Sequence, residues 1–388
     1  MLKIKKIRNF NLKSKKILIR VDLNVPTKNG IITDETRIKN IIPSLKKIIS
    51  NDGLPVIISH LGRPKKKDSK YSLKKIVKPL SKSLGKKVFF INDCIGINVV
   101  NALNKIKPGQ ILLLENLRFH KEEMMNDITF AKKLSKPFDI YINEAFSASH
   151  RNHASIDKIT KFLPSGIGIN MEKELFNLHK FLHKPRQPLT AIIGGSKMES
   201  KIKTINNLIK KCTFLILGGG IANTFLKSKN INIGKSIYEK KQIKNAIDIQ
   251  KLAKNRGCEI ILPVDVVVSN KNKSIDIKDI KNNYKIFDVG IKTINIIKKK
   301  INCSSTVIWS GPLGFFEKKP FDNSTNKISN IINSNKRLIS IAGGGDTIAA
   351  IKKNKKFKNF TFLSTGGGAF LSWLEKYTLP GIEVLKKN

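Results

Sequence analysis

Cysteines, acidic residues and long apolar runs are all scarce in this chain of 388 residues. The four cysteines, Cys94, Cys212, Cys258 and Cys303, are too widely spaced to form a CxxC pair, which favours reduced, structural thiols in a cytoplasmic protein. No run of about 18 apolar residues occurs, and the N-terminal stretch MLKIKKIRNF lacks the apolar core of a signal peptide. We therefore expect a soluble, untargeted protein that does not bind a membrane.

The shortage of acidic residues leaves 28 Asp and Glu against 74 Lys and Arg, a formal net charge of +46 at pH 7. Such an excess is typical of proteins that bind nucleic acids or membrane surfaces, because basic side chains displace counterions from polyanions. Here, however, only nine of the basic residues are arginines, and the lysines are spread along the whole chain. We interpret the charge as a compositional bias of solvated loops and helix faces. A lysine-rich polyanion-binding protein remains the alternative.

The chain is longer than one hydrophobic core usually supports, so we expect two domains. Residues 171–184 follow the glycine-rich break at 166–168 and precede Pro185, a pattern that predicts a linker helix between the domains. His179 and His183 stand four residues apart on this helix. Because no third ligand is evident, we interpret them as part of an exposed helix face rather than a zinc site.

Glycine-rich turns follow five apolar runs in the second half of the chain. In LISIAGGGDT, residues 338–347, a run typical of a buried parallel strand ends in three glycines and an Asp-Thr pair. Bare glycines let a phosphate approach backbone N–H groups at the positive end of a helix, and Asp346 would supply an oxygen ligand for Mg²⁺. The other runs are AIIGGSK (191–197), LILGGGIAN (215–223), VIWSGPLG (307–314) and FLSTGGGAF (362–370). We expect one sheet whose carboxyl edge carries these turns and binds the ligand.

Arginines occur close to the ends of strand-like runs in the first half. These runs are residues 16–21, 54–59, 111–114 and 139–142. Arg63, Arg118 and Arg151 come after the last three, and Arg37 lies near the first turn of a helical pattern. A cation suits that helix position only if an anion lies nearby. Because a guanidinium pairs with two phosphate or carboxylate oxygens, the four arginines predict a site for a small, multiply anionic metabolite. For any single arginine, a surface ion pair is the alternative.

Two lysines, Lys197 and Lys201, follow the Gly194-Gly195 turn. We expect both on an opening helix, where their ammonium groups would face the same phosphates and would repel each other without an anion. The turn at 311–317 ends in Glu317, a carboxylate suited to ribose hydroxyls. The chain has no Walker sequence and only approaches G-x-G-x-x-G, which argues against a dinucleotide-dependent oxidoreductase.

Taken together, the chain resembles phosphoglycerate kinase over essentially its full length. The stretches that carry the resemblance, in the family's order, are RVDLNVP, SHLGRP, LENLRF, GGSKMESK, LGGGIANTF, WSGPLGFFE, IAGGGDT and STGGGAFL. The resemblance implies an α/β fold of two Rossmann-like three-layer domains with parallel sheets, joined by a hinge helix. It implies a phosphoglycerate-binding domain at 1–170, on which the tail 380–388 packs back. The implied nucleotide-binding domain is 171–379 and includes the linker helix 171–184.

The resemblance also implies the reaction, which is reversible phosphoryl transfer between 1,3-bisphosphoglycerate and ADP, giving 3-phosphoglycerate and ATP in glycolysis. The implied enzyme is a monomer with small-molecule substrates, Mg²⁺ as its cofactor, and no specific nucleic-acid partner. Its catalytic residues would be Arg37, Lys197 and Lys201, and Asp346 would be the metal ligand. The residues that match the phosphoglycerate site are Asp22, Asn24, Arg37, His60, Leu61, Gly62, Arg63, Arg118 and Arg151. Those that match the nucleotide site are Lys201, Glu317, Gly344, Gly345, Asp346 and Thr347.

The acceptor in such a reaction is a carboxylate, which is ionised at neutral pH and needs no general base. Catalysis then consists of positioning the reactants and neutralising charge on a loose transition state, and closure of the two domains would exclude water. The chain departs from the family's pattern at Ser310, at Ser147 within residues 143–151, and at Lys376-Tyr377. These departures concern the expected hinge and loop geometry.

Overall fold

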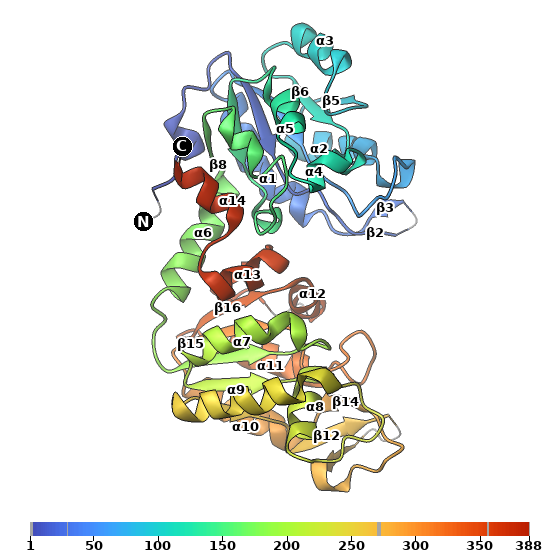
Figure 1. Ribbon diagram of the computed structural model, residues 1–388, viewed down its shortest axis with the longest axis vertical. Helices are drawn as coiled ribbons and strands as arrows, with labels where there is room; N and C mark the ends of the chain where they lie inside the picture. Colours follow the sequence, from blue (N-terminus) through green and yellow to red (C-terminus); the bar gives the residue numbers. More distant parts are fainter. Residues whose placement is uncertain (1–2, 29, 270–272, 355–356, 388) are drawn as a thin grey trace. The chain divides into compact units, whose positions relative to one another are not determined.

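The computed structural model describes residues 3–28, 30–269, 273–354 and 357–387. The chain forms two compact units, one of residues 1–176 together with 378–388 and one of residues 177–377. The first boundary lies within helix α6 (Ile169–Leu182) (Figure 1). The boundary expected from the sequence, at residue 170, falls instead where this helix begins.

A six-stranded parallel sheet forms the centre of the first unit, in the order β5-β6-β4-β1-β7-β8. The strands are β1 (Lys16–Arg20), β4 (Leu54–Ile58), β5 (Val88–Ile91), β6 (Ile111–Leu114), β7 (Ile140–Asn143) and β8 (Ser165–Ile167). A short hairpin pairs β2 (Thr27–Lys28) with β3 (Ile31–Ile32). The unit's helices are α1 (Thr36–Ile49), α2 (Val77–Leu84), α3 (Ile97–Lys105), α4 (Lys121–Met124), α5 (Ile128–Ser135), the start of α6 and α14 (Pro380–Glu383).

Strand β1 is apolar at consecutive positions because helices cover both faces of the sheet. Ile17 and Ile19 belong to one buried cluster with the apolar side chains of α1 and α2. Leu18, which points to the opposite face, belongs to another cluster with those of α3 and α5. Burial on both faces therefore produces the three-layer arrangement. Because helices cover both faces, polar side chains are placed at the ends of the strands.

The second unit contains another six-stranded parallel sheet, in the order β11-β10-β9-β15-β16-β17. The strands are β9 (Leu189–Ile193), β10 (Phe214–Leu217), β11 (Glu259–Ile261), β15 (Thr306–Ser310), β16 (Ile339–Gly343) and β17 (Phe362–Ser364). A smaller antiparallel sheet contains β12 (Asp265–Val268), β13 (Ser274–Asp276) and β14 (Ile286–Val289). The helices are α7 (Ile202–Ile209), α8 (Gly219–Ser228), α9 (Ile243–Asn255), α10 (Ile291–Asn302), α11 (Asn323–Ser334), α12 (Gly345–Lys353) and α13 (Gly368–Lys376).

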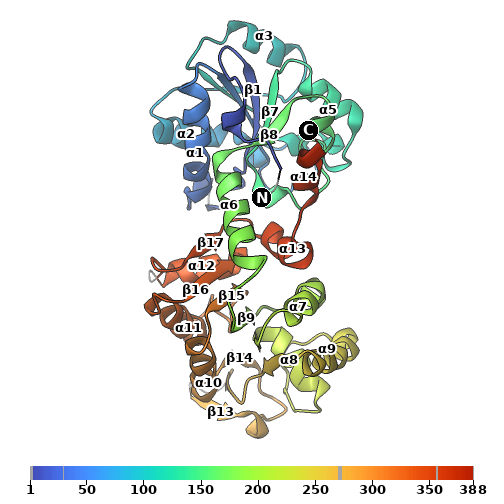
Figure 2. The ribbon, with the colours of Figure 1, turned by 90° about the vertical axis from the view of Figure 1, so that its left-hand side faces the viewer.

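Helices lie on both faces of the large sheet in this unit too. Trp309 on β15 belongs to a buried cluster with the apolar faces of α10, α11 and α12. Helices α7 and α9 lie on the opposite side, as Figure 2 shows. The sequence prediction of an α/β fold with two parallel sheets between helices is confirmed, including the five strands that end in glycine-rich turns. The antiparallel sheet was not anticipated.

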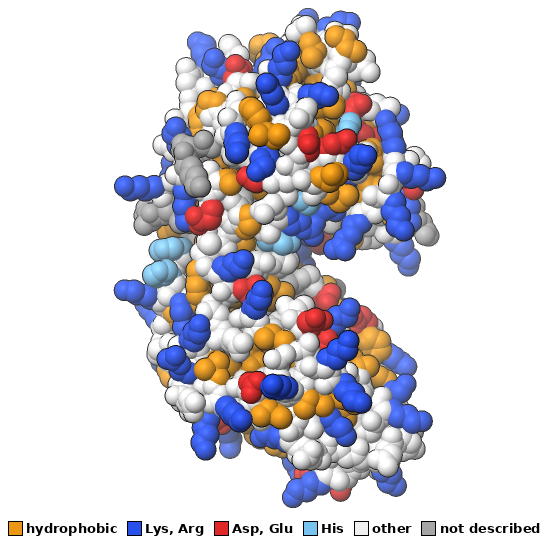
Figure 3. Space-filling view, viewed as in Figure 1, with side chains coloured by type: hydrophobic (Ala, Val, Ile, Leu, Met, Phe, Trp, Pro, Cys, Tyr) orange, Lys and Arg blue, Asp and Glu red, His pale blue; other side chains and the backbone are white. Residues whose placement is uncertain are grey.

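Basic side chains are distributed widely over the surface of each unit. On the face drawn in Figure 3, lysines and arginines lie among polar and apolar side chains over the whole visible surface of each unit. This distribution is consistent with a compositional bias. Within the described part of the chain, no helix has both the length and the apolar character needed to cross a membrane.

Candidate functional site

The carboxyl ends of four adjacent strands carry the site residues of the first unit. In the sheet order β6-β4-β1-β7, each strand is parallel to its neighbours, so these four strand ends lie along one edge. The predicted residues follow β1 (Asp22 and Asn24), β4 (His60, Leu61, Gly62 and Arg63), β6 (Arg118) and β7 (Arg151). Arg37, near the start of α1, is linked to these residues by its hydrogen bond to Asp22.

Hydrogen bonds tie three of these loops together. The side-chain oxygen of Asn24 accepts a hydrogen bond from the Gly62 N–H at 2.8 Å. The Gly62 carbonyl in turn accepts one from Nη1 of Arg118 at 2.5 Å. Gly62 has a φ of +65°, and a Cβ at this position would overlap the ring of Tyr71. Only glycine therefore fits where the loops after β1, β4 and β6 meet.

Arg37 is held by an internal carboxylate. Its Nη1 donates to Oδ2 of Asp22, which also accepts from the hydroxyl of Ser147. Burial by itself would raise the pKa of Asp22, but Arg37 and these hydrogen bonds hold that pKa well below its usual range. Ser147, one of the departures from the family's pattern, thus contacts a predicted site residue directly.

Guanidinium groups lie close enough to repel one another at this edge. Burial, followed by the charges of Arg151 and Arg20, lowers the pKa of Arg118 to about 10. Burial, followed by the charge of Arg63, lowers the pKa of Arg151 as well. Nε of Arg118 is buried without a hydrogen-bond partner. A multiply charged anion would relieve this repulsion and satisfy the unpaired donor.

Sequence reasoning missed Arg20, which is fully buried at the end of β1. Its Nη2 lies 3.0 Å from Nδ1 of His60, a predicted site residue. The signal was an arginine inside the apolar run KILIRV, since a buried arginine needs partners.

Glycine-rich turns meet at the carboxyl edge of the second sheet. The Gly194 N–H donates to the Ser310 carbonyl at 2.9 Å, and a Cβ on Gly194 would overlap the carbonyl oxygen of Pro312. Gly219 has a φ of +62°, and a Cβ at this position would overlap the carbonyl oxygen of Gly195. Thr347 accepts the Gly311 N–H at 2.6 Å through its hydroxyl. Glycine lets the turns after β9, β10 and β15 come into backbone contact.

Lys201 is directed into this edge. Its Nζ donates to the carbonyl oxygens of Gly194 at 2.5 Å and Ser310 at 3.3 Å. Burial lowers the pKa of Lys201 to about 8, although the nearby charge of Asp346 opposes the change.

The expectation that Lys197 and Lys201 share an opening helix is wrong. A 3₁₀ turn at Glu199–Lys201 leads into α7, which begins at Ile202, and Lys197 lies exposed in the preceding loop. The carboxylate of Glu239 accepts the N–H groups of Met198 and Glu199, the latter at 3.1 Å. These N–H groups are thereby satisfied outside a regular helix, so the helix starts later.

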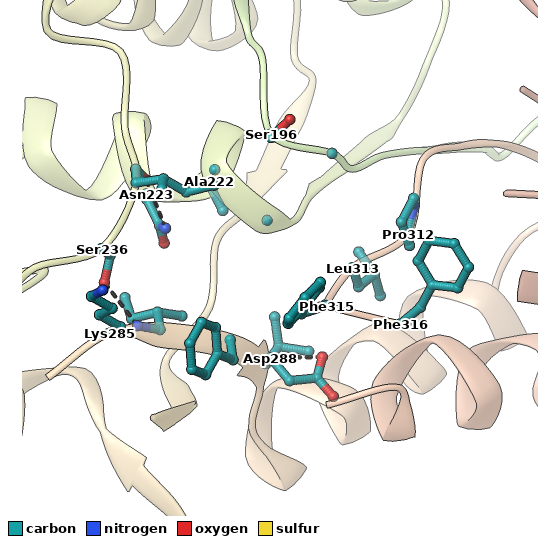
Figure 4. Close-up of a pocket in the computed structure, with 18 of the residues that line it drawn as sticks. Ser196, Ala222, Asn223, Ser236, Lys285, Asp288, Pro312, Leu313, Phe315 and Phe316 are labelled. Atoms are coloured by element: carbon teal, nitrogen blue, oxygen red, sulfur yellow. Dashed lines mark hydrogen bonds between the residues drawn. The ribbon is translucent and has the colours of Figure 1, made fainter. Parts of the chain in front are cut away.

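A cavity of about 490 Å³ opens beside these turns (Figure 4). Of the predicted residues, Glu317 and Asp346 line it, whereas Lys197, Lys201, Gly344, Gly345 and Thr347 lie outside its lining. Its apolar wall includes Pro263, Leu313, Phe287 and Phe315, and polar groups are supplied by Ser196, Asn223, Ser236 and Lys285.

Sequence reasoning missed residues 235–237 and 285–289 of this wall. The second group forms β14 and the residue before it, in the unanticipated antiparallel sheet. Asp288 on β14 accepts the N–H of Ser324 at 3.0 Å and also its hydroxyl. Burial nevertheless raises the pKa of Asp288 to about 7. The carboxylate thus joins the cavity wall to the start of α11.

The donor set at the cavity suits a weakly held hard cation. Asp346 is an exposed carboxylate in the first turn of α12 and lines the cavity. Within the described ranges, no cluster of three or more His, Cys, Asp or Glu side chains could hold a metal ion. The rings of His179 and His183 stack with their centroids 5.0 Å apart. Mg²⁺ is commonly bound by one or two carboxylates together with nucleotide phosphates and waters, and a single Asp346 fits that pattern.

Comparisons with known proteins agree with one another. A sequence model of the family described as phosphoglycerate kinase matches residues 7–376. The phosphoglycerate kinase of Xanthobacter flavus is 42% identical over 386 residues, which cover 97% of each chain. That of Wolbachia sp. subsp. Brugia malayi is 42% identical over 395 residues, covering 100% of this chain and 99% of the relative. The structure of phosphoglycerate kinase from Coxiella burnetii matches with a TM-score of 0.88 at 37% identity and covers 99% of both chains.

Proposed function

This chain belongs to the phosphoglycerate kinase family, and from that premise we propose which of its residues carry the reaction. The protein is a glycolytic kinase that transfers a phosphoryl group reversibly between 1,3-bisphosphoglycerate and ADP, giving 3-phosphoglycerate and ATP. Neither the family nor the relatives support the alternative of a polyanion-binding protein. We further propose that it acts as a monomer in the cytoplasm.

The phosphoglycerate site lies in the first unit. The observation that carries this assignment is the group of mutually repelling guanidinium groups, in which Nε of Arg118 is buried and unpaired. Arg63, Arg118 and Arg151 bind the phosphate and carboxylate oxygens of the substrate, because each guanidinium offers paired donors. Asp22, Asn24, His60 and the backbone of Leu61-Gly62 orient its remaining polar atoms.

Arg37 acts on the transferred group. It is paired with Asp22, and this pairing fixes its position at the site. When the negatively charged phosphoryl group approaches, Arg37 neutralises charge that develops on its oxygens. The acceptor carboxylate is already ionised at neutral pH, so no side chain has to remove a proton.

The nucleotide occupies the cavity of the second unit. Its apolar wall suits a purine ring, and the exposed carboxylate of Glu317 suits ribose hydroxyls. The glycine turn at Gly344-Gly345 and Thr347 offers backbone N–H groups to phosphates at the start of α12. Lys201 and Lys197 supply positive charge to the transferred phosphoryl group, Lys201 from its buried position and Lys197 from its exposed loop.

We assign Mg²⁺ to the nucleotide phosphates with Asp346 as its protein ligand. When bound, the ion would neutralise phosphate charge.

The assignment of Arg37 is tested by Arg37→Ala. We expect kcat to fall by about a hundredfold or more, because one charge-stabilising donor is lost, while the far-UV circular dichroism spectrum is retained. The assay couples 3-phosphoglycerate-dependent ATP consumption to NADH oxidation. The matched control is Arg8→Ala, which removes an exposed arginine of the same unit that pairs with Glu172 at 2.9 Å. Near-normal turnover of a folded Arg37→Ala protein would reject the role of Arg37.

A further inference from the structure

Arg20 is a fully buried cation next to the proposed phosphoglycerate site, and no ligand contact has been assigned to it. Its guanidinium makes three kinds of contact inside the first unit. Nη1 donates to the carbonyl of Val21, Nε donates to the hydroxyl of Ser155 at 3.1 Å, and Nη2 lies 3.0 Å from Nδ1 of His60. A buried arginine costs considerable desolvation energy, so these contacts need an explanation.

The hydrogen bonds around Arg20 run in one direction. The Ser155 hydroxyl donates to Oε1 of Glu123 at 2.6 Å, and its N–H donates to Oε2 at 2.9 Å. Because the hydroxyl uses its one hydrogen in the bond to Glu123, its oxygen accepts from Nε of Arg20. Glu123 and Ser155 are both fully buried. Glu123 therefore acts, through Ser155, as the counter-charge that keeps the guanidinium in place.

The direction of the hydrogen bond from Arg20 determines the tautomer of the His60 ring. A guanidinium has only donors, so Nδ1 of His60 accepts the hydrogen bond from Arg20 and carries no proton. In the neutral ring the proton is then on Nε2. Among the described residues Nε2 has no hydrogen-bond partner, and it is not one of the fully buried polar atoms without a partner. It is thus the ring nitrogen that is open to a ligand.

We infer that Arg20 is a positioning residue for the phosphoglycerate site, which, through the series Glu123–Ser155–Arg20–His60, fixes the His60 imidazole with Nδ1 as acceptor and Nε2–H as the donor to the substrate. This inference rests on the proposed role of His60 in substrate binding. Arg20 itself touches no substrate atom in this arrangement. It acts by holding the ring of a residue that does.

The charges around His60 favour the same state. Its pKa lies well below the ordinary value because the ring is buried and faces Arg20, Arg118 and Arg151, with Asp22 as the opposing charge. Another positive charge would add to the repulsion among these arginines. A neutral ring with a fixed Nε2–H instead offers the substrate a hydrogen bond of defined direction. The surrounding cations cannot define such a direction by charge alone.

The test is a histidine-selective ¹⁵N spectrum, in which unprotonated and protonated ring nitrogens resonate far apart. The chain has six histidines, and the His60 signals are assigned by their loss in His60→Ala. In the wild-type protein we expect an unprotonated Nδ1 and a protonated Nε2 from about pH 8 to about pH 5, below the ordinary histidine pKa of about 6.5. An Nδ1–H ring or an imidazolium in this range would overturn the inference.

The variant Arg20→Met/Glu123→Gln removes the contact while leaving no unbalanced buried charge. In this variant we expect His60 to become an imidazolium as the pH falls through the ordinary range. An unchanged spectrum and titration would overturn the inference. Arg20→Lys keeps the charge and one donor, so we expect Nδ1 to remain unprotonated. If the double variant fails to fold, protonation of Nδ1 in Arg20→Lys at about pH 7 would count against the inference.

Kinetics distinguish this inference from the proposed function. We expect the double variant to raise the KM for 3-phosphoglycerate about tenfold, the equivalent of one hydrogen bond to a charged ligand, and to add less than about twofold in a His60→Ala background. Arg8→Met is the matched control and should leave KM unchanged. If His60→Ala itself leaves KM unchanged, the proposed site role of His60 fails. If His60→Ala raises KM but the Arg20 variant does not, the role of Arg20 fails.

Discussion

The pH dependence of nucleotide binding should depend on Lys201. Its Nζ donates hydrogen bonds to the carbonyl oxygens of Gly194 and Ser310, and burial lowers its pKa from 10.5 to about 8 against the opposing effect of Asp346. The ammonium group therefore loses its proton near pH 8. Phosphates bound at the adjacent turns would favour the charged form and raise the pKa again.

The magnitude follows from linkage between proton and ligand binding. If the phosphates restore the pKa from about 8 to the ordinary 10.5, ADP affinity falls about tenfold for each pH unit between these values. The full effect corresponds to about 3 kcal/mol, an upper limit because the side chain is only partly shielded from solvent. At about pH 8, where half of the free lysine is neutral, binding should take up about half a proton.

The measurement is isothermal titration calorimetry of ADP between about pH 8 and about pH 10, above the phosphate pKa of about 6. Buffers with different ionisation enthalpies give the number of protons taken up. Lys201→Arg is the matched control, because a guanidinium stays charged over this range and should give a flat profile. An ADP affinity that is independent of pH in the wild-type protein, or the same slope in Lys201→Arg, would refute the reasoning.

Two further predictions concern stability. Gly194→Ala should destabilise the second unit by about 1–3 kcal/mol, because the new Cβ overlaps the Pro312 carbonyl and forces two turns apart. The destabilisation is measured by urea unfolding followed through the fluorescence of the two tryptophans, both of which lie in this unit. The control is Gly345→Ala, which has open space around the new Cβ and should change stability by less than about 0.5 kcal/mol. Equal effects of the two substitutions would contradict the packing argument. Glu144→Gln should flatten the pH dependence of the first unit, since burial raises the pKa of this carboxyl from 4.5 to about 7. The folded state keeps a proton that the unfolded state releases, and stability falls by about 3 kcal/mol as the pH rises between these values. The stability of the first unit is measured by hydrogen exchange of β1 peptides in urea at about pH 5 and about pH 8. An equally steep pH dependence of stability in the wild-type protein and in Glu144→Gln would count against this prediction.

The local features of both units could be predicted from the sequence. Continuous apolar runs such as KILIRV and LISIAGGG become buried parallel strands because only a strand covered on both faces needs apolar side chains at consecutive positions. The glycines after the strands of the second unit predicted turns in which backbones approach closely, and Gly194 and Gly219 make such contacts. Residues that follow the carboxyl ends of parallel strands lie at one edge of the sheet, so the sequence predicts which residues share that edge. It does not predict which of these strands are neighbours.

Other features depend on pairings between residues far apart in the sequence. Glu239 satisfies the N–H groups of Met198 and Glu199, which moved the helix start and removed Lys197 from it. The antiparallel sheet, whose strand β14 forms part of the cavity wall, consists of short strands with little periodic signal.

The sequence by itself determined the α/β architecture, the glycine turns and the types of side chain at the strand ends, because these follow from local periodicity and backbone freedom. The tertiary structure alone decided the order of the strands, the pairing of Arg37 with Asp22 and the burial of Lys201. It also decided the series of hydrogen bonds from Glu123 to His60. The physical reason is that burial and charge pairing depend on which distant segments become neighbours, and no local pattern records that choice.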